Sequence, residues 1–118
     1  MDSPIQTVSI VIPMYSYGEY LEEALESVIN QSVKPHEIIC VSDGAIDNSV
    51  GIAKAFQMKH PEHNIIILEK ENGGLSSARN YGIKHSTGKY YMSFDSDDIL
   101  RPDAIKEHLK LADEKSIV

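Results

Sequence analysis

Short apolar runs alternate with longer segments of helical periodicity along this chain. The runs at residues 8–12, 37–41 and 65–68 are almost continuously apolar, which is typical of strands covered on both faces. A fourth run, at residues 89–94, is rich in aromatic residues and also predicts a strand. Strands that alternate with helices favour parallel pairing through right-handed crossovers. We therefore predict an α/β fold, a three-layer, doubly wound and mostly parallel Rossmann-like sheet with about four strands and four helices.

The segments between these runs predict the helices. Apolar residues recur at helical spacing through residues 19–31, and Val50, Ala53 and Phe56 do so in a second segment. Pro13 is expected to end the first strand, and Pro102 to lie in the first turn of the last helix. The predicted helices are residues 19–31, a helix capped within residues 47–49, residues 75–85 after a turn at 72–74, and a last helix that ends near residue 115.

Composition narrows the functional classes. The 118 residues suit one domain, residues 1–118, and 11 basic against 18 acidic residues give a net charge of −7. This charge argues against non-specific nucleic-acid binding, which needs a basic surface. The only cysteine, Cys40, lies in an apolar run and is expected to be buried and inert. No apolar stretch approaches the roughly 20 residues of a membrane span, and residues 1–6 do not read as a signal peptide, so we expect a cytoplasmic setting.

Polar residues follow each predicted strand. Because the carboxyl ends of parallel strands meet at one edge of a sheet, and ligands bind there, we expect a site at this edge. The segments that meet there are Pro13 to Ser16, Ser42 to Ala45, Glu69 to Gly74 and Asp95 to Asp98.

The last of these segments places three carboxylates in four residues, Asp95, Asp97 and Asp98. Crowded carboxylates repel one another, and a divalent cation would relieve that repulsion. Oxygen ligands of this kind suit Mg²⁺ or Mn²⁺. Asp95 and Asp97 share a face if the strand geometry persists there. The residues alone leave a second interpretation open, an acidic N-terminus for the following helix.

Five segments in order resemble the N-terminal half of family 2 glycosyltransferases, which are inverting enzymes of the GT-A fold. They are VSIVIPMYS, YLEEALESVINQS, EIICVSDGAIDNS, ENGGLSSARNYGI and YYMSFDSDDILRPD, and they span residues 8–109. The resemblance implies a nucleotide-diphosphosugar donor, with uridine the expected base, and Mn²⁺ or Mg²⁺ as cofactor. It also implies sugar transfer to a hydroxyl of a saccharide or lipid-linked acceptor.

The resemblance implies roles for single residues at the nucleotide. Tyr15, after Pro13, matches the tyrosine that packs on the base, and Asp43 matches the carboxylate that accepts a hydrogen bond from it. Gly74 lies in the turn that lets the backbone approach the nucleotide, and Arg79 is expected close by. Plainer interpretations stay open here: a surface tyrosine, a turn aspartate and a solvated helix arginine.

At the metal, Asp97 resembles the principal ligand, and Asp95 either shares the metal or contacts the ribose. Asp98 is expected only to cap the last helix, and Asp47 to cap the second. The sequence departs from the family pattern at Ser16, where asparagine is usual, and at Ala45, where serine is usual. Neither departure touches the two metal-binding aspartates.

By the same resemblance, the acceptor-binding half and the catalytic base are expected to lie outside this chain, so no catalytic residue is predicted. Two hypotheses follow: a donor-binding half of a glycosyltransferase, or a non-catalytic half-domain that binds nucleotide weakly or serves as a structural module. Either one is expected to expose a sheet edge and to self-associate. A phospho-receiver domain and a dinucleotide-binding domain are disfavoured, because neither acidic residues nor Gly-x-Gly-x-x-Gly follow the first strand.

Overall fold

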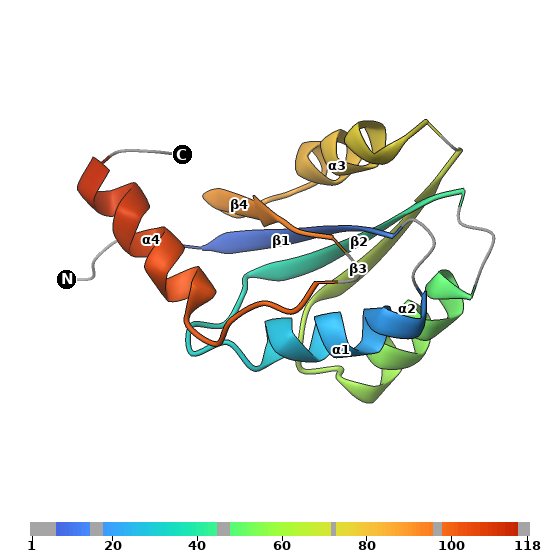
Figure 1. The fold of residues 1–118 in the computed structure, drawn as a ribbon, viewed down its shortest axis with the longest axis horizontal. Helices are drawn as coiled ribbons and strands as arrows, with labels where there is room; N and C mark the ends of the chain where they lie inside the picture. The colour runs from blue at the N-terminus through green and yellow to red at the C-terminus, as the bar shows by residue number, and fades with distance from the viewer. Residues whose placement is uncertain (1–6, 15–17, 45–47, 72, 96–97, 116–118) are drawn as a thin grey trace.

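The structure is a computed structural model that describes residues 7–14, 18–44, 48–71, 73–95 and 98–115. Within these ranges four strands alternate with four helices, which confirms the predicted α/β class (Figure 1). The elements are β1 (Val8–Met14), α1 (Gly18–Ile29), β2 (Glu37–Asp43), α2 (Ser49–Lys59), β3 (Ile65–Lys70), α3 (Leu75–Lys84), β4 (Tyr90–Ser93) and α4 (Ala104–Lys115).

The four strands form one parallel sheet in the order β3-β2-β1-β4. From β1 the chain proceeds outward to β2 and β3 and then returns to add β4 on the other side of β1. Strand order therefore reverses between β1 and β4. Such a switch point, at the carboxyl edge, is where doubly wound sheets bind ligands.

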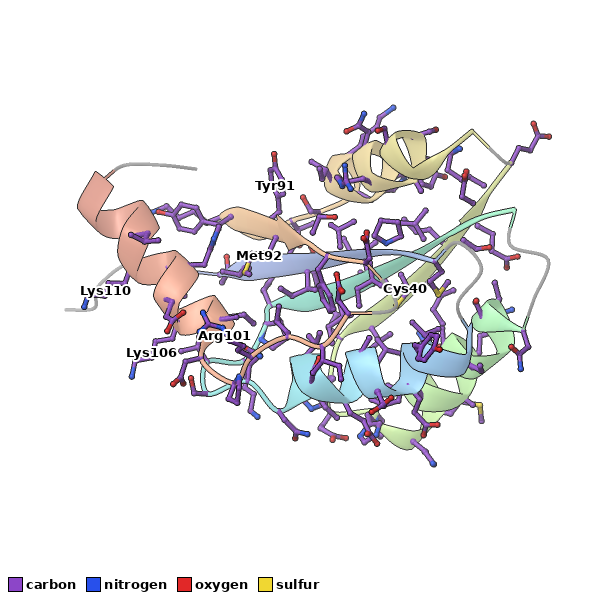
Figure 2. The ribbon with its side chains drawn as sticks, viewed as in Figure 1. Cys40, Tyr91, Met92, Arg101, Lys106 and Lys110 are labelled. Atoms are coloured by element: carbon purple, nitrogen blue, oxygen red, sulfur yellow. The ribbon has the colours of Figure 1, made fainter. Side chains whose placement is uncertain are left out.

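Helices cover both faces of the sheet, as predicted. Helices α1 and α2 lie on one face, α3 lies on the other, and α4 lies near the edge where the strands begin (Figure 1). Side chains alternate accordingly: Ile10 and Ile12 of β1 belong to the larger apolar cluster, while Ile39 and Val41 of β2 pack against Ala78 of α3. Figure 2 shows the same alternation in β4, where Tyr91 and Met92 point to opposite faces.

Strand β1 does not end at Pro13, so that prediction is wrong. Pro13 and Met14 pair with β2 opposite Val41 and Ser42. The main chain of Val11 faces β4, because its carbonyl accepts a hydrogen bond from the N–H of Phe94 at 3.2 Å. Pro13, two residues on, faces the same side, but β4 has already ended at Ser93. Proline is tolerated there because no neighbouring strand needs its missing N–H.

The predicted start of the last helix is corrected, whereas the predicted start of the second helix, within residues 47–49, is confirmed. Helix α4 begins at Ala104, so Pro102 precedes its first turn, and Asp98 lies too far upstream to cap it. Asn48 occupies the N-cap position of α2, but its side chain makes no capping hydrogen bond. Asp47 lies outside the described residues.

The buried side chain of Gln31 fixes the segment that leads into α4. Its Oε1 accepts a hydrogen bond from the N–H of Ile105 at 3.0 Å, and its Nε2 donates to the carbonyl of Arg101 at 2.5 Å. Arg101, Lys106 and Lys110 lie at this end of the molecule (Figure 2). Among the described residues, no helix combines the length and apolar character that crossing a membrane requires.

A second buried polar group, Glu37, lies at the start of β2, at the edge opposite the predicted site. Its carboxylate accepts hydrogen bonds from the Ser9 hydroxyl at 2.6 Å and from the Thr87 N–H at 2.6 Å and hydroxyl at 3.1 Å. The N–H of Gly88 donates to Ser9 Oγ at 2.9 Å. Burial alone raises the pKa of Glu37, but these hydrogen bonds and nearby His36 hold it below its ordinary value. The network ties the α3–β4 connection to β1 and β2.

Candidate functional site

The carboxyl edge of the sheet, on the face that α3 covers, brings several predicted residues together. Asp43 is the last residue of β2 and follows Ile39 and Val41 on this face. Its register partner in β3 is Lys70. The last residue of β4, Ser93, shares the face, because Arg79 of α3 contacts it. Strands β2 and β3 each run two residues beyond their predicted ends, so Asp43 and Lys70 belong to strands rather than to loops.

Asp43 has a buried carboxylate that holds the connection between β3 and α3. The whole Asp43 residue is 2% exposed. Oδ1 accepts from the N–H of Gly73 at 2.9 Å and from Lys70 Nζ at 3.1 Å, and Oδ2 accepts from the N–H of Gly74 at 2.8 Å. Lys70 Nζ also donates to the carbonyl of Glu71 at 2.7 Å. Burial alone raises the pKa of Asp43, but the Gly73 N–H, the Lys70 ammonium and the Gly74 N–H together hold it below its ordinary value.

Local backbone geometry requires glycine at position 74, and neighbouring side chains approach closely at position 73. Gly74, the N-cap of α3, has φ 98° and ψ 167°, a conformation open essentially to glycine alone. A Cβ on Gly73 would lie 2.8 Å from Ser77 Oγ and 3.0 Å from Lys70 Nζ. The predicted close approach of backbone at Gly74 is therefore sterically available, and whether a nucleotide uses it stays a prediction.

Arg79 is half-buried on α3 and points to the switch-point side of the sheet. Its Nε donates to Ser93 Oγ at 3.2 Å, so it is not the freely solvated helix arginine of the plainer interpretation. Among the described residues, no carboxylate lies within ion-pair distance of its guanidinium. A half-buried cation without a carboxylate partner, in a chain of net charge −7, suits an anionic ligand.

The acidic segment is described only in part. Asp95 is half-buried, two residues beyond the end of β4, and Asp98 is exposed. Asp97 and Tyr15 lie outside the described residues, so the metal contact and the base stacking stay predictions. Across the described ranges, no three His, Cys, Asp or Glu side chains gather as a metal-binding group.

Lys70 and Ser93 are site residues that the sequence interpretation did not identify. The strand alternation carries the missing signal, because Lys70 follows Ile66 and Leu68 at every second position on the α3 face. Ser93 likewise follows Tyr91. Ser93 already lies within the predicted strand at residues 89–94, and extending the predicted third strand by one alternation would have placed Lys70 on the same face.

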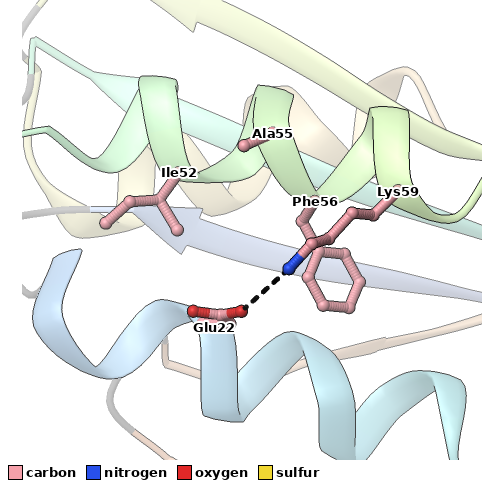
Figure 3. A pocket seen from close by; sticks show the side chains of 5 residues that line it. All are labelled: Glu22, Ile52, Ala55, Phe56 and Lys59. Atoms are coloured by element: carbon pink, nitrogen blue, oxygen red, sulfur yellow. Dashed lines mark ion pairs between the residues drawn. The ribbon is translucent and has the colours of Figure 1, made fainter.

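A separate pocket of ≈ 180 Å³ lies between α1 and α2 (Figure 3). An ion pair crosses it, from Lys59 Nζ to Glu22 Oε2 at 4.0 Å, with both side chains more than half exposed. Its other lining residues are Ile52, Ala55 and Phe56. None of the predicted site residues lines this pocket, so it is not part of the candidate site.

The sequence of this chain matches a known enzyme family over almost its whole length. Residues 9–118 match the family model described as glycosyl transferase family 2. The chain therefore belongs to glycosyltransferase family 2, as the five segments predicted.

Curated relatives are considerably longer than this chain. It is 40% identical over 108 residues to the minor teichoic acid biosynthesis protein GgaB of Bacillus subtilis, covering 90% of this chain and 12% of GgaB. It is 38% identical over 111 residues to glycosyltransferase GlyG of Streptococcus pneumoniae, covering 93% of this chain and 36% of GlyG. The chain thus spans little more than a third of these relatives at most.

Solved structures confirm the GT-A-like fold. Residues 1–349 of TarS from S. aureus, in complex with UDP, superpose with a TM-score of 0.80 at 25% identity, covering 94% of this chain and 33% of that one. The same TarS fragment is also known in complex with UDP-GlcNAc. The mannosyltransferase PcManGT from Pyrobaculum calidifontis, in complex with GDP-Man and Mn²⁺, gives a TM-score of 0.86 over 97% of this chain and 34% of that one. Its 21% identity supports a shared fold only.

Proposed function

We propose that this chain is the donor-binding part of an inverting glycosyltransferase. It binds a nucleotide-diphosphosugar, with a UDP-sugar the preferred candidate, together with Mn²⁺ or Mg²⁺. The sugar passes to a hydroxyl of a saccharide or lipid-linked acceptor. The observation that carries this proposal is Arg79, a half-buried guanidinium at the switch point that no described carboxylate neutralises. A diphosphate is an anion that such a group binds well.

The nucleotide site comprises residues of three strand ends and the start of α3. Tyr15 stacks on the base, and Pro13, near the end of β1, is assigned to the same nucleotide site. Asp43 already accepts three of the about four hydrogen bonds open to a carboxylate, and its side chain is 1% exposed, so its assignment to a base N–H requires the carboxylate to become accessible when the nucleotide binds. Gly74 gives the nucleotide access to main chain, and Arg79 pairs with phosphate.

Asp95 and Asp97 hold the metal ion in this proposal. The donor set fits, since Asp95 is a half-buried carboxylate with no ion-pair partner among the described residues. Hard oxygen donors of this kind select Mn²⁺ or Mg²⁺ over softer ions. When bound, the metal supplies charge neutralisation for the leaving diphosphate. Asp97 is the principal metal ligand in this proposal. Asp95 either shares the metal ion or contacts the ribose.

Inversion at the anomeric carbon also requires a general base that deprotonates the acceptor hydroxyl. We assign that role to no residue of this chain. The testable part of the proposal is therefore donor binding rather than turnover.

Calorimetric titration of UDP and of GDP into the 118-residue chain, with Mn²⁺ and then with a chelator, tests the proposal. We expect binding that depends on the metal and that Asp97→Ala abolishes. Arg79→Met should weaken binding about tenfold, the loss of roughly one charge-assisted hydrogen bond. The matched control is Arg101→Met, which removes an exposed arginine paired with Glu107 near α4 and should leave binding unchanged. If the folded chain binds neither UDP nor GDP, the proposal is refuted.

A further inference from the structure

Lys70 and Asp43 form a charge pair at the proposed donor site, and no sequence motif assigned a role to the lysine. Lys70 Nζ lies 3.1 Å from Asp43 Oδ1, and the two side chains are 17% and 1% exposed. A carboxylate so buried is not stabilised by water and must be compensated by protein donors. Lys70 supplies the only ammonium or guanidinium within ion-pair distance of Asp43 among the described residues.

This pair fixes the main chain of the β3–α3 connection at three points. Lys70 Nζ donates to the carbonyl of Glu71, and the two oxygens of Asp43 accept from the N–H groups of Gly73 and Gly74. A Cβ on Gly73 would lie 3.0 Å from Lys70 Nζ, so the lysine also packs directly on the connection. The connection is thereby tied to the ends of both β2 and β3.

The position of α3 depends on the same contacts. The carbonyl of Gly74 accepts the first helical hydrogen bond, from the N–H of Ala78 at 3.0 Å. The next residue along the helix is Arg79, whose Nε reaches Ser93 at the end of β4. A shift of Gly74 would therefore move the start of α3 and displace the guanidinium that the proposed function assigns to phosphate.

We infer that Lys70 is a positioning residue of the donor site: through Asp43 and the β3–α3 connection it sets the place of Gly74 and Arg79 toward the nucleotide diphosphate. This inference rests on the proposed function. The ammonium group of Lys70 already donates to Asp43 and to the carbonyl of Glu71. The inference therefore predicts that loss of Lys70 weakens nucleotide binding through these contacts. The lowered pKa of Asp43 agrees with a carboxylate that stays ionised to hold the connection.

The test compares Lys70→Met with Lys54→Met in the 118-residue chain. Lys54 forms an exposed ion pair with Glu69 at 3.9 Å, so the control removes the same charge and the same side chain away from Asp43. UDP affinity with Mn²⁺ is measured by calorimetry, and the backbone amide signals of Gly73 and Gly74 are followed by NMR without ligand. We expect Lys70→Met to lower the affinity about tenfold and to move both amide signals. We expect Lys54→Met to do neither, and Lys70→Arg, which keeps a donor and a charge, to recover most of the affinity.

The failures of the inference and of the proposed function are distinguishable. If the wild-type chain binds neither UDP nor GDP, the proposed function fails and the inference fails with it. If the wild-type chain binds and Lys70→Met binds equally well, the inference alone is overturned. A Lys70→Met chain that does not fold is replaced by Lys70→Gln, whose amide still donates but carries no charge. Unchanged affinity in that variant, with shifted Gly73 and Gly74 amides, would also overturn the coupling.

Discussion

Glu37 offers the sharpest test of how this fold uses buried charge. Replacing it by alanine removes the acceptor of three hydrogen bonds, from Ser9 and from the N–H and hydroxyl of Thr87. Replacing it by glutamine changes only one oxygen. Oε2 receives both 2.6 Å bonds, so the amide oxygen can take that place. The amide nitrogen then faces the Thr87 hydroxyl, which can accept from it and donate to its other neighbour, His36 Nε2.

The two variants should therefore differ strongly in stability. Hydrogen bonds to a charged group contribute about 1.5–3 kcal/mol each but are not additive, and removing the buried carboxylate relieves its desolvation. We expect Glu37→Ala to lower the free energy of unfolding by roughly 3 kcal/mol, or about 12 °C in Tm for a chain of this size. Glu37→Gln loses only the charge assistance, so we expect a loss of about 1 kcal/mol.

The pH dependence separates charge from geometry. The pKa of folded Glu37 is lowered from its ordinary value of 4.5, so its stabilisation is present above that value and is lost as pH falls through the folded pKa. Glutamine does not titrate. The difference in unfolding free energy between wild type and Glu37→Gln should therefore narrow below about pH 5. Urea unfolding at several pH values measures it. A difference that stays constant with pH, or a Glu37→Gln loss equal to that of Glu37→Ala, would refute the reasoning.

The remaining predictions concern glycines and the thiol. Gly82→Ala places a Cβ 2.5 Å from Val11 Cγ1 and should cost about 1–3 kcal/mol, whereas Gly51→Ala, which meets nothing within 4 Å, should add about 0.5–1 kcal/mol through helix propensity. Urea unfolding of both variants gives the comparison, and equal effects would contradict it. Gly74→Ala should cost about 1–3 kcal/mol, measured as a fall in Tm. The cost comes from backbone strain alone, because a Cβ on Gly74 meets nothing within 4 Å. Burial raises the pKa of Cys40 to about 12, so a thiol reagent should label it only after unfolding; fast labelling of the native chain would contradict its burial.

Element order and fold class follow from the sequence because burial on both faces leaves an unmistakable apolar run. The predicted runs at 8–12, 37–41 and 65–68 all lie within observed strands. The strand ends were less predictable. Asp43 and Lys70 are charged residues inside a sheet, and their place depends on a partner from the neighbouring strand that the local sequence does not reveal. Whether a proline at position 13 can belong to β1 depends on where β4 ends, and β4 lies about eighty residues further along the chain.

The candidate site was predictable in its location but less so in its contacts. Parallel topology brings the strand ends to one edge, which placed Asp43 there, whereas the face that Asp43 shares with Arg79 follows from the contacts of α3 in the structure. The hydrogen bonds of Asp43 to Gly73 and Gly74 depend on the three-dimensional path of the β3–α3 connection, which no local pattern encodes. The same holds for the approach of Arg79 to Ser93.

Helix α3 explains why strand β2 carries a buried carboxylate at each end. Glu37 and Asp43 are its first and last residues and lie on the same face, six positions apart and therefore about 20 Å from each other along the strand. Asp43 holds the main chain just before α3, and Glu37 holds the main chain just after it. A helix of 10 residues is about 15 Å long and fits between them.

The polar contacts at its two ends add to an apolar contact with the sheet that, among the described side chains of α3, includes Ala78 and the partly buried Tyr81. Its only buried apolar side chain among those described is Ala78, and Gly82 lies directly against Val11. Small residues such as these allow close approach to the sheet but bury little area themselves. Two charged anchors on one rigid strand then fix the helix in both position and tilt. Because Arg79 lies on that helix, the electrostatics of β2 determine where the guanidinium stands at the switch point.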